Sequence, residues 1–403
     1  MTRIAPTLTA DQASAGTWDA VVIGAGPAGA YTALGLARAG LATLLVDRKA
    51  FPRHKVCGGC LNARAVAWLE HAGVAAHLWA SGARALSSIC LQHGRRRAVL
   101  SLPPGMAVSR ATLDAALLRA AILANCAFLP ETSALVESAI DRVGSGRGEA
   151  RWVSLALRDG QRARIGARVV VVADGLGHSS LRDATSMQSV VASDARVGVG
   201  AVGHAGCVGS EPGRITMAVS DHGYVGVTAV ENDLVNVAAA LDVGYLKACG
   251  SPAAAVRAVL ASAGVSASAS LDRFDWQGTL PLTRRLLSPV APGMFVLGDA
   301  AGYIEPFTGE GMAWALAAAD AVVPLAICAS RGWSADIADQ WRRTYDTLVR
   351  QEQSWCRGLA RGLRHPRLVA FVVASLSRQP GLARPFLWRG SPGTAAHSIG
   401  ERR

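Results

Sequence analysis

A glycine-rich turn between two apolar runs limits the fold more than any other feature of this sequence. Residues 18–23, WDAVVI, are a short apolar run, and the G-x-G-x-x-G of residues 24–29 follows it directly. A helical pattern then extends to Gly40, and a second apolar run, LATLLVD, ends on Asp47. This order of strand, glycine turn, helix, strand and acid predicts a dinucleotide-binding Rossmann unit.

Each part of this unit has a predicted role. Gly24 allows the tight turn, Gly26 lets the backbone approach a pyrophosphate, and Gly29 lets the helix pack closely on the strand. The helix N-terminus offers free N–H groups and a positive dipole end to the phosphates. Asp47 is placed to accept the ribose hydroxyls, which favours NAD or FAD over NADP. The predicted contacts in this unit are Gly24, Gly26, Pro27, Ala28, Gly29 and Asp47.

A second G-x-G-x-x-G, at residues 198–203, is predicted to be glycines within a strand. The stretch after it, HAGCVGSEPG, is loop-like, and no helix, strand and acid follow. With one Rossmann fingerprint, the chain is expected to lack a second dinucleotide domain.

Composition places the chain among globular proteins. It has 403 residues, of which 51% are hydrophobic and 17% charged. The net charge of +12 comes almost entirely from arginine, and we attribute it mainly to codon usage. No basic helix or basic–aromatic platform occurs, so no nucleic-acid partner is expected. An acidic substrate or an anionic membrane surface stays open as a partner.

Cysteine usage and apolar runs predict the location of the protein. The eight cysteines have no framework spacing, and residues 1–17 have no apolar signal region, which together favour a reducing cytoplasm. No uninterrupted apolar run reaches the roughly 18 residues that a membrane span needs. The best candidate, 311–330, contains Asp320 and a proline and is predicted to be a helix buried in protein.

Two later motifs decide which dinucleotide binds. Residues 167–182 form a buried strand ending in Asp174-Gly175, and residues 293–321 form a strand ending in Gly298-Asp299, then a loop and a long helix. Together with the N-terminal fingerprint, these motifs resemble the FAD-dependent group that includes p-hydroxybenzoate hydroxylase and geranylgeranyl reductase. The resemblance implies FAD as cofactor and NAD(P)H as electron donor.

The resemblance also assigns roles to residues. Asp299 would bind the ribityl chain, the loop 306–312 would lie against the flavin ring, Arg110 would lie near the pyrophosphate, and Arg48 near the adenine. The family has a serine four residues after the central Asp, where this chain has His178, with serines at 179 and 180. The cofactor contacts implied by the resemblance are Arg48, Cys57, Gly58, Gly59, Arg110, Asp174, Gly175, Gly298, Asp299, Pro306, Gly309, Gly311 and Met312.

A C-x-x-C at Cys57 and Cys60 raises the alternatives of zinc or a redox dithiol. Zinc would need a second pair of ligands and a dithiol a second nucleotide domain, and the sequence offers neither, so no metal is expected. The stretch 55–59, KVCGG, resembles the Lys-x-Cys-Gly-Gly element of geranylgeranyl reductases near the isoalloxazine. Cys57 would then border the reaction site, in a chemical or a packing role, and Cys60 would be incidental.

The predicted fold is α/β, with a discontinuous Rossmann-type FAD-binding domain, an antiparallel sheet that binds substrate, and a helical C-terminus. Residues 1–17 are expected to be a flexible leader and 346–403 the helical segment. That basic segment either touches a membrane or packs as a helix pair on the FAD domain. The predicted FAD domain comprises 18–83, 106–189 and 271–345, and the sheet domain 84–105 and 190–270.

Two reactions compete for the reduced flavin. The leading interpretation is a monooxygenase that hydroxylates a phenol-like or polyketide-type molecule, and the second is a reductase of prenyl alkenes. KVCGG favours the reductase, but residues 224–228, YVGVT, lack the tryptophan of the lipid reductases. Cys57, His222 and Tyr224 are the candidate catalytic residues. The substrate is expected to be small and apolar or aromatic, and a non-catalytic flavin-binding protein is the alternative of another class.

Overall fold

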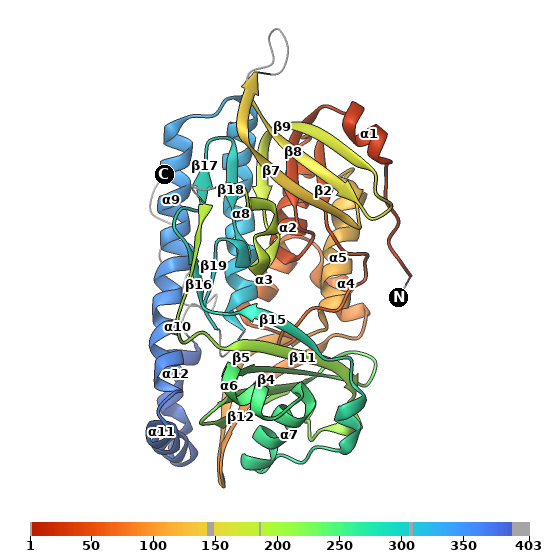
Figure 1. Ribbon diagram of the computed structural model, residues 1–403. Coiled ribbons are helices and arrows are strands. Elements are labelled where there is room, and N and C mark those ends of the chain that lie inside the picture. The colour runs from red at the N-terminus through yellow and green to blue at the C-terminus, as the bar shows by residue number, and fades with distance from the viewer. Residues whose placement is uncertain (1, 143–148, 185–186, 306–308, 389–403) are drawn as a thin grey trace.

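The structure is a computed structural model that describes residues 2–142, 149–184, 187–305 and 309–388. It has a nucleotide-binding part built on a largely parallel sheet and a second part built on another large sheet. Figure 1 shows the first part above the second, with helices of the C-terminal segment running along one side of both. The predicted mixed α/β class is confirmed.

The sheet of the first part has the strand order β17-β18-β9-β1-β2-β6. The pairs from β18 to β6 are all parallel, while β7, β8 and β17 are added in antiparallel fashion. The inner strands are apolar where they are buried, at residues 20–23 of β1 and 169–172 of β9, because helices cover the sheet. Its strands are β1 (Trp18–Ile23), β2 (Thr43–Val46), β6 (Ala127–Leu129), β7 (Thr132–Arg142), β8 (Glu149–Leu157), β9 (Arg162–Val172), β17 (Val290–Ala291) and β18 (Met294–Val296).

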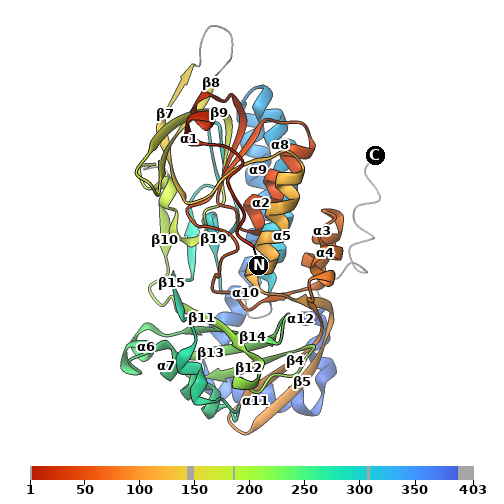
Figure 2. The same ribbon diagram turned by 90° about the vertical axis from the view of Figure 1, so that its right-hand side faces the viewer.

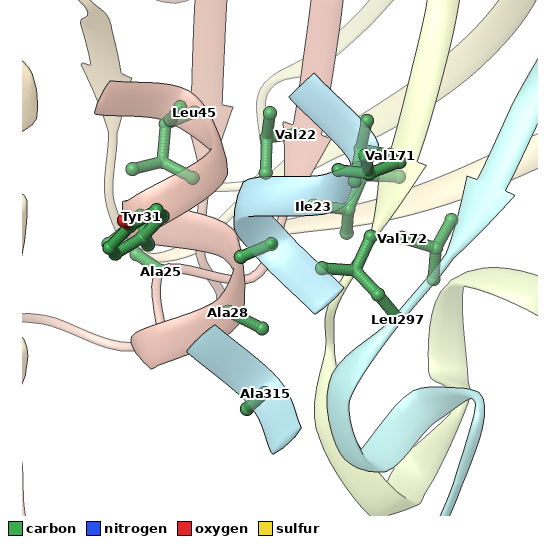
Figure 3. Packing of buried hydrophobic residues seen from close by; sticks show 14 of the residues in the cluster. Val22, Ile23, Ala25, Ala28, Tyr31, Leu45, Val171, Val172, Leu297 and Ala315 are labelled. Atoms are coloured by element: carbon green, nitrogen blue, oxygen red, sulfur yellow. The ribbon is translucent and has the colours of Figure 1, made fainter. Parts of the chain in front are cut away.

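Three helices pack side by side against this sheet. They are α2 (Pro27–Arg38), α5 (Arg110–Leu123) and α8 (Glu310–Arg331), and α2 contacts both of the others. Figure 3 shows how closely α2 and α8 approach, with Ala28 of α2 and Ala315 of α8 near Ile23 of β1 and near Leu297, which follows β18. Small side chains at this junction bring the helix and strand backbones close to the nucleotide site.

The long apolar helix α8 is a core helix. By length and composition it is the one helix of the described residues that could cross a membrane, but 61% of its apolar window is buried inside the protein. Leu316 and Val322 are fully buried against the rest of the core. The predicted burial of 311–330 is therefore confirmed.

The second sheet has the order β15-β11-β14-β13-β12-β4-β5-β3. Every pair is antiparallel except β12 with β4, which is parallel. The second G-x-G-x-x-G, at residues 198–203, lies within β11, which confirms that it is part of a strand and not a nucleotide-binding turn. Its strands are β3 (Cys60–Leu61), β4 (Arg84–His93), β5 (Arg96–Ala107), β11 (Val197–His204), β12 (Arg214–Ser220), β13 (Gly223–Ala229), β14 (Leu234–Leu241) and β15 (Gln277–Pro281).

The two faces of this sheet have different neighbours. Val225 and Val227 of β13 pack with α7 (Pro252–Ser262), whereas Tyr224, Gly226 and Thr228 point to the opposite face, as the two-residue period of a strand requires. That opposite face looks toward the nucleotide part. A third, small sheet joins β10 (Ser189–Val191), β16 (Arg284–Leu286) and β19 (Gly302–Tyr303).

The predicted domain limits differ from the strand pairing at three places. Strands β3 and β15 and the end of β5 belong to the second sheet, although the predicted limits put residues 60–61, 277–281 and 106–107 in the FAD domain. Strands β3 and β15 are short, and their sequences carry no sign of which sheet they join. Figure 2 shows the remaining short helices at the margins, namely α3 (Ala63–His71), α4 (Ala75–Ala80) and α6 (Val243–Ala248).

The N-terminal segment packs on the nucleotide part, which corrects the expectation of a flexible leader. It contains the helix α1 (Ala10–Ala15), capped by Thr9. Ile4 is buried, and its backbone N–H donates to the Phe51 carbonyl at 2.9 Å. Trp18 Nε1 donates to the carbonyl of Ala13 at 2.8 Å, so side-chain and backbone contacts both hold the segment.

The C-terminal helices contact both parts. Helix α9 (Ala335–Tyr345) inserts Trp341 into the nucleotide core, and α10 (Gln351–Gly362) follows a π-helical turn at 346–350. Helix α11 (Pro366–Arg378) packs on β4 and β5 of the second sheet, followed by a 3-10 turn at 380–383 and α12 (Arg384–Leu387). The expected helix pair on the FAD domain is therefore wrong for α11, whose buried side chains belong to the core of the second sheet.

The burial of α8 yields a stability prediction. Leu316→Ala removes a fully buried side chain and should lower the free energy of unfolding by about 2–5 kcal/mol. Leu123→Ala, at a position that is 84% exposed at the end of α5, should change it by less than about 0.5 kcal/mol. Urea unfolding followed by circular dichroism measures both. Equal effects of the two substitutions would contradict the assignment of α8 to the core.

Candidate functional site: an FAD-binding cleft beside an apolar chamber

The turn between β1 and α2 can be built only with glycine at two positions. Gly24 has φ +101°, and a Cβ there would lie 2.4 Å from the carbonyl oxygen of Ala173. A Cβ on Gly29 would lie 1.8 Å from the carbonyl oxygen of Gly24. Gly26 is the N-cap of α2, with Pro27 as the first helical residue, so the free N–H groups of the helix face the place where a pyrophosphate would bind.

Asp47 holds this turn from the end of β2. Its Oδ2 accepts a hydrogen bond from the backbone N–H of Ala25 at 2.8 Å, and its Oδ1 accepts one from Lys49 at 2.9 Å. The carboxylate is 7% exposed. Each oxygen has a second lone pair, so Asp47 can still accept from a ribose hydroxyl. Arg48, which is exposed, lines the same cavity as Asp47.

Two guanidinium groups converge on Gly26. Arg110 donates from Nε and Nη2 to the two oxygens of Asp114 at 2.8 Å each, and Arg53 Nη2 lies 3.4 Å from Asp114 Oδ2. A Cβ on Gly26 would lie 3.5 and 3.6 Å from the Nη2 atoms of Arg53 and Arg110. Burial alone would lower the pKa of Arg110, but Asp114 raises it overall, so the guanidinium stays charged. The cradle thus fits an anionic phosphate.

Two cavities share one wall along this part of the molecule. The outer one, about 720 Å³, is lined by Asp47, Arg48 and Asp174. The inner one, about 180 Å³, is lined by Asp299 and Met312 and by side chains of the second sheet. Five residues line both cavities, so the two form one elongated cleft. These residues are Lys55, Val56, Gly175, Leu176 and Thr279.

The Asp174-Gly175 motif has a carboxylate oxygen without a hydrogen-bond donor in the part of the chain that the structure describes, and Asp174 lines the outer cavity. Asp174 Oδ2 accepts from the backbone N–H and the hydroxyl of Ser180 at 3.0 and 2.9 Å. Asp174 Oδ1 is buried and has no partner among the described residues. His178 adopts a left-handed conformation with φ +44°, and burial lowers its pKa. The serine that bonds to Asp174 most closely is therefore Ser180, six residues after it, and not a residue at position 178.

The Gly298-Asp299 motif and the helix that follows it bring a charge pair and a helix N-terminus to the inner cavity. Lys55 Nζ lies 3.3 Å from Asp299 Oδ2, and burial lowers the pKa of Lys55 while Asp299 opposes that shift. Helix α8 begins after Gly309, whose φ is +83°, and Gly311 and Met312 of its first turn line the cavity. Its positive dipole end suits the negative charge of a reduced flavin. Gly298 also lines the cavity, and Pro306 lies outside the described residues.

The segment after Lys55 is pinned at the junction of the two parts. Asn236 of β14 donates from Nδ2 to the Cys57 carbonyl at 2.5 Å, and Gly59, with φ +68°, accepts from the N–H of Val108 at 2.9 Å. Cys57 and Gly58 line the inner cavity. Burial raises the pKa of Cys60 to about 12, so its thiol is protonated at neutral pH.

An ionisable cluster that sequence reasoning missed lies at the far wall of the inner cavity. Glu305 is 4% exposed, accepts from Arg196 Nη1 at 3.3 Å, and accepts from the hydroxyl of Tyr224. Burial raises the pKa of Glu305, while Arg196 opposes the shift. Burial also raises the pKa values of Tyr224 and Tyr303, which line the cavity too. A lone glutamate or arginine in a loop has no sequence signature, so no pattern could have found them.

Two of the candidate catalytic residues, Tyr224 and His222, lie in different places, one in the inner cavity and the other at the surface. Tyr224 lies in the inner cavity beside Glu305. His222 is exposed in the turn between β12 and β13 and stacks on Tyr245, with ring centroids 4.2 Å apart. It is not among the residues that line the cleft. Its side chain belongs to the sheet surface rather than to the site.

The comparisons with known proteins agree with this cleft. A family model described as FAD binding domain matches residues 17–336. Menaquinone reductase from Mycolicibacterium smegmatis is 30% identical over 332 residues, which cover 74% of this chain and 73% of the relative. Menaquinone reductase from Mycobacterium tuberculosis is 28% identical over 365 residues, covering 82% of each chain. The solved structure of PqsL from Pseudomonas aeruginosa, in complex with 2-aminobenzoylacetate, has a TM-score of 0.69 at 19% identity, covering 89% of this chain and 99% of PqsL.

The chain belongs to the FAD binding domain family, because the family model spans most of its length. It is an FAD-dependent oxidoreductase, and FAD is its cofactor. The geometry of the cleft fits that cofactor independently of the comparisons. Glycines leave room where a side chain would clash, two guanidinium groups lie at Gly26, and a buried oxygen of Asp174 has no hydrogen-bond partner among the described residues. The predicted membership in the hydroxylase and reductase superfamily is confirmed.

Removal of Arg110 should weaken FAD binding. Arg110→Gln deletes one of the two charges at Gly26 and leaves Asp114 with Arg53 alone. We expect at least about a tenfold higher dissociation constant for FAD, equivalent to about 1.4 kcal/mol. Fluorescence titration of the apoprotein with FAD measures it.

The matched control for this prediction lies on the same helix. Arg119→Gln removes a guanidinium that contacts only the carbonyl of Thr2 among the interactions of the described residues, and it should bind FAD as the unmodified protein does. Equal affinity of the two variants would contradict the role given to Arg110.

Proposed function

We propose that this enzyme reduces a carbon–carbon double bond of a lipid-soluble substrate, such as the prenyl chain of a quinone, with electrons from NAD(P)H. The observation that carries the proposal is a second cavity beside the flavin site. It has a volume of about 80 Å³ and is lined by apolar side chains such as Leu86, Leu102 and Phe386 and, in addition, by Arg64, Glu310 and Glu352. Cys60 and Ile215 line both this cavity and the inner one, so these two side chains form the partition between them.

An elongated apolar substrate suits this arrangement. The sheet wall of the inner cavity is formed by Met217, Leu282 and Ile215 together with small residues such as Gly226 and Ala238. Such a surface binds hydrocarbon by burial of apolar area, and the polar groups beside it, Tyr224, Tyr303 and Glu305, are gathered at the far wall. A chain longer than the inner cavity could continue past Cys60 and Ile215 toward the C-terminal helices.

The similarity to known proteins supports the same choice. The menaquinone reductases share 28–30% identity with this chain over more than two thirds of their length, whereas PqsL shares 19%. The KVCGG stretch, which resembles geranylgeranyl reductases, lies at the inner cavity through Lys55, Cys57 and Gly58. A lipid-soluble quinone resides in a bilayer, so peripheral contact with a membrane belongs to this proposal.

The residues of the chain have separable roles in such a reduction. Bound FAD, once reduced by NAD(P)H, supplies a hydride equivalent to one carbon of the double bond. Glu305 holds the proton that the other carbon requires, since its raised pKa keeps the carboxyl protonated nearer to neutral pH than an ordinary glutamate. Tyr224 orients that carboxyl through its hydrogen bond, and Arg196 stabilises the carboxylate left after proton transfer. Cys57 lines the cavity next to the reacting face and fixes the Gly58–Gly59 backbone.

Hydroxylation of a phenol-like molecule is the second candidate. Its support is the shared fold with PqsL, described as a probable FAD-dependent monooxygenase, and the acid–tyrosine pair that a phenol could contact. The two reactions differ in their products. A prenyl quinone incubated anaerobically with enzyme and NADPH, and then reoxidised so that its ring is again a quinone, should retain two added hydrogens by mass spectrometry. If product forms only with oxygen present and carries one added oxygen atom, the hydroxylase is the function and the reductase proposal is wrong.

Glu305 yields a pH prediction. The charged and titratable neighbours of Glu305 are Arg196, Arg364, Tyr224 and Tyr303, and together with burial they leave its pKa above the ordinary range. Because the proton donor must be protonated, the rate of reduction should fall as pH rises through that raised pKa. The native state also binds more protons than the unfolded state there, so the free energy of unfolding should decrease over the same pH interval.

Variants of Glu305 and a neighbour separate these effects. Glu305→Gln should lower the single-turnover rate of flavin oxidation by substrate on the order of 100-fold and abolish the alkaline fall. Asp242→Asn removes the other acid that pairs with Arg196, outside the cavity, and should keep the pH profile. Stopped-flow measurement of flavin absorbance from pH 5 to pH 9 tests both. An unchanged pH profile in Glu305→Gln would exclude this residue as the proton donor.

The partition between the cavities yields a chain-length prediction. Ile215→Phe enlarges a side chain that is 2% exposed and lines both cavities. Turnover of a long-chain quinone should fall on the order of tenfold while that of a one-prenyl analogue changes little, at a stability cost of about 1–3 kcal/mol. Ile89→Phe, equally buried in the same cluster but lining neither cavity, is the control for overpacking. An equal loss for both chain lengths would argue against a passage at Ile215.

A further inference from the structure

We propose that the exposed side of the C-terminal helices docks on the surface of an anionic phospholipid bilayer, from which the lipid substrate enters. We define this C-terminal face by the residues Leu368, Phe371, Val372, Leu382, Phe386 and Trp388, with Arg367, Arg378 and Arg384 around them. This inference rests on the proposed function, because the bilayer matters for catalysis only if the substrate is a lipid.

Helix α11 has two apolar stripes, of which only one packs against the rest of the described chain. Val369 and Val373 are buried on the second sheet. Leu368, Phe371 and Val372 have the spacing i, i+3 and i+4, which places them on another side of the helix, and they are 45%, 69% and 40% exposed. Exposure of a phenylalanine ring to water is unfavourable in free energy, and burial of the ring in a lipid interface is favourable.

The apolar side chains continue beyond α11. Leu382 and Phe386 are 53% and 60% exposed, and Trp388 is 37% exposed. Phenylalanine, leucine and tryptophan are the side chains that interfacial helices bury among lipid headgroups and acyl chains. Large exposed apolar side chains are therefore gathered in residues 368–388 of the described chain, on consecutive elements at one end of the molecule, as Figure 1 shows.

The charges around this face have one sign. From Glu352 to Glu401 the sequence has seven arginines and no Asp or Glu between these two residues. Arg367 and Arg378 lie four residues before and seven residues after Phe371, which puts them on the same side of α11 as its ring. Arg384 lies over the Trp388 ring at 5.6 Å. Basic side chains beside exposed aromatic rings are the pattern that attracts anionic headgroups.

The β4–β5 hairpin adds to the same charge. Arg95 and Arg96 are exposed at its turn, and α11 packs on both of its strands. Figures 1 and 2 show the tip of the hairpin at the end of the molecule where α11 lies. Arg97, by contrast, is paired with Glu211, and Arg364 with Asp194, so these two arginines bind the protein itself. The cationic surface therefore extends from the helices to the tip of the second sheet.

The cavity beside the flavin site connects this face to the chemistry. Phe386 and Leu387 line the cavity of about 80 Å³, and so do Cys60 and Ile215, which also line the inner cavity. A lipid that leaves the bilayer at Phe386 would thus enter a cavity that Cys60 and Ile215 separate from the inner one. A protein partner needs no such opening, whereas a membrane substrate does, and for this reason we assign the face to a bilayer.

A vesicle flotation experiment with the full-length, FAD-loaded protein tests the inference. The vesicles are pure phosphatidylcholine or phosphatidylcholine with 30% phosphatidylglycerol by mole, a fraction on the order of that used to give an anionic surface. Flavin absorbance of the floated fraction reports the bound protein. We expect binding to the anionic vesicles, weak binding to the neutral ones, and release by high salt, because the attraction is screened.

Paired variants test the apolar and the cationic components. Leu368→Ser with Phe371→Ser, and separately Arg367→Gln with Arg378→Gln, should each weaken vesicle binding on the order of tenfold. The controls are Leu123→Ser and the pair Arg162→Gln with Arg182→Gln, which change exposed residues of the nucleotide part. The altered α11 residues line none of the cavities of the site, so turnover of a detergent-dispersed short-chain quinone should stay unchanged.

The outcomes separate this inference from the proposed function. If the protein binds neither vesicle type, or if the α11 variants bind as well as the controls, the docking face is wrong. A concentration-dependent dimer that Phe371→Ser abolishes would assign the face to a second copy and would also overturn it. If vesicle binding follows the expected pattern but no double bond is reduced, the docking face stands and the reductase proposal fails.

Discussion

The close approach of α2 to the turn that precedes it determines much of this structure. The missing side chain at Gly29 lets the helix lie directly against the backbone of Gly24. A second glycine of α2, Gly35, would place a Cβ 2.7 Å from Val323 of α8, so α8 in turn lies close to α2. Helix α8 then reaches Cys60 at its N-cap, where a Cβ on Gly309 would lie 3.0 Å from the Cys60 carbonyl oxygen. Three glycine contacts in series thus set where the α8 N-terminus meets the flavin site.

The ionisable groups of the site are divided between two environments. At the nucleotide end, Arg53 and Arg110 share the buried Asp114, and both guanidinium groups lie near Gly26, where a phosphate would bind. At the far wall of the inner cavity, burial outweighs Arg196 and raises the pKa of Glu305. One end therefore favours a fixed anion and the other favours a neutral acid. A flavin bound between them would have its phosphates and its reacting ring in the environments that each requires.

The sequence was sufficient where a motif needs particular residues at fixed spacing. The turn at residues 24–29, Asp47, and the Asp174 and Asp299 motifs could be predicted because strand ends and glycine backbones have few alternatives. It was insufficient where packing between distant segments decides the outcome. Glu305 acquires its role only because Arg196, more than one hundred residues earlier, folds onto it. His222 has the same two-residue offset from Tyr224 that a strand would use, but it lies in the turn, where that offset no longer fixes the direction of a side chain.

Small residues on the second sheet widen the inner cavity, as the proposed lipid substrate would require. The family's lipid reductases resemble this chain at residues 224–228 but carry a tryptophan where Gly226 lies here. Gly226 and Ala238 are opposed on β13 and β14 and both line the inner cavity, so their missing side chains widen it. The same face of the sheet is closed at its other end by Val369 and Val373 of α11. The sheet thus has an open half above the flavin site and a closed half under the C-terminal helices, with Ile215 between them. A chain that follows this face from the inner cavity past Ile215 would reach the cavity that Phe386 and Leu387 of α12 line.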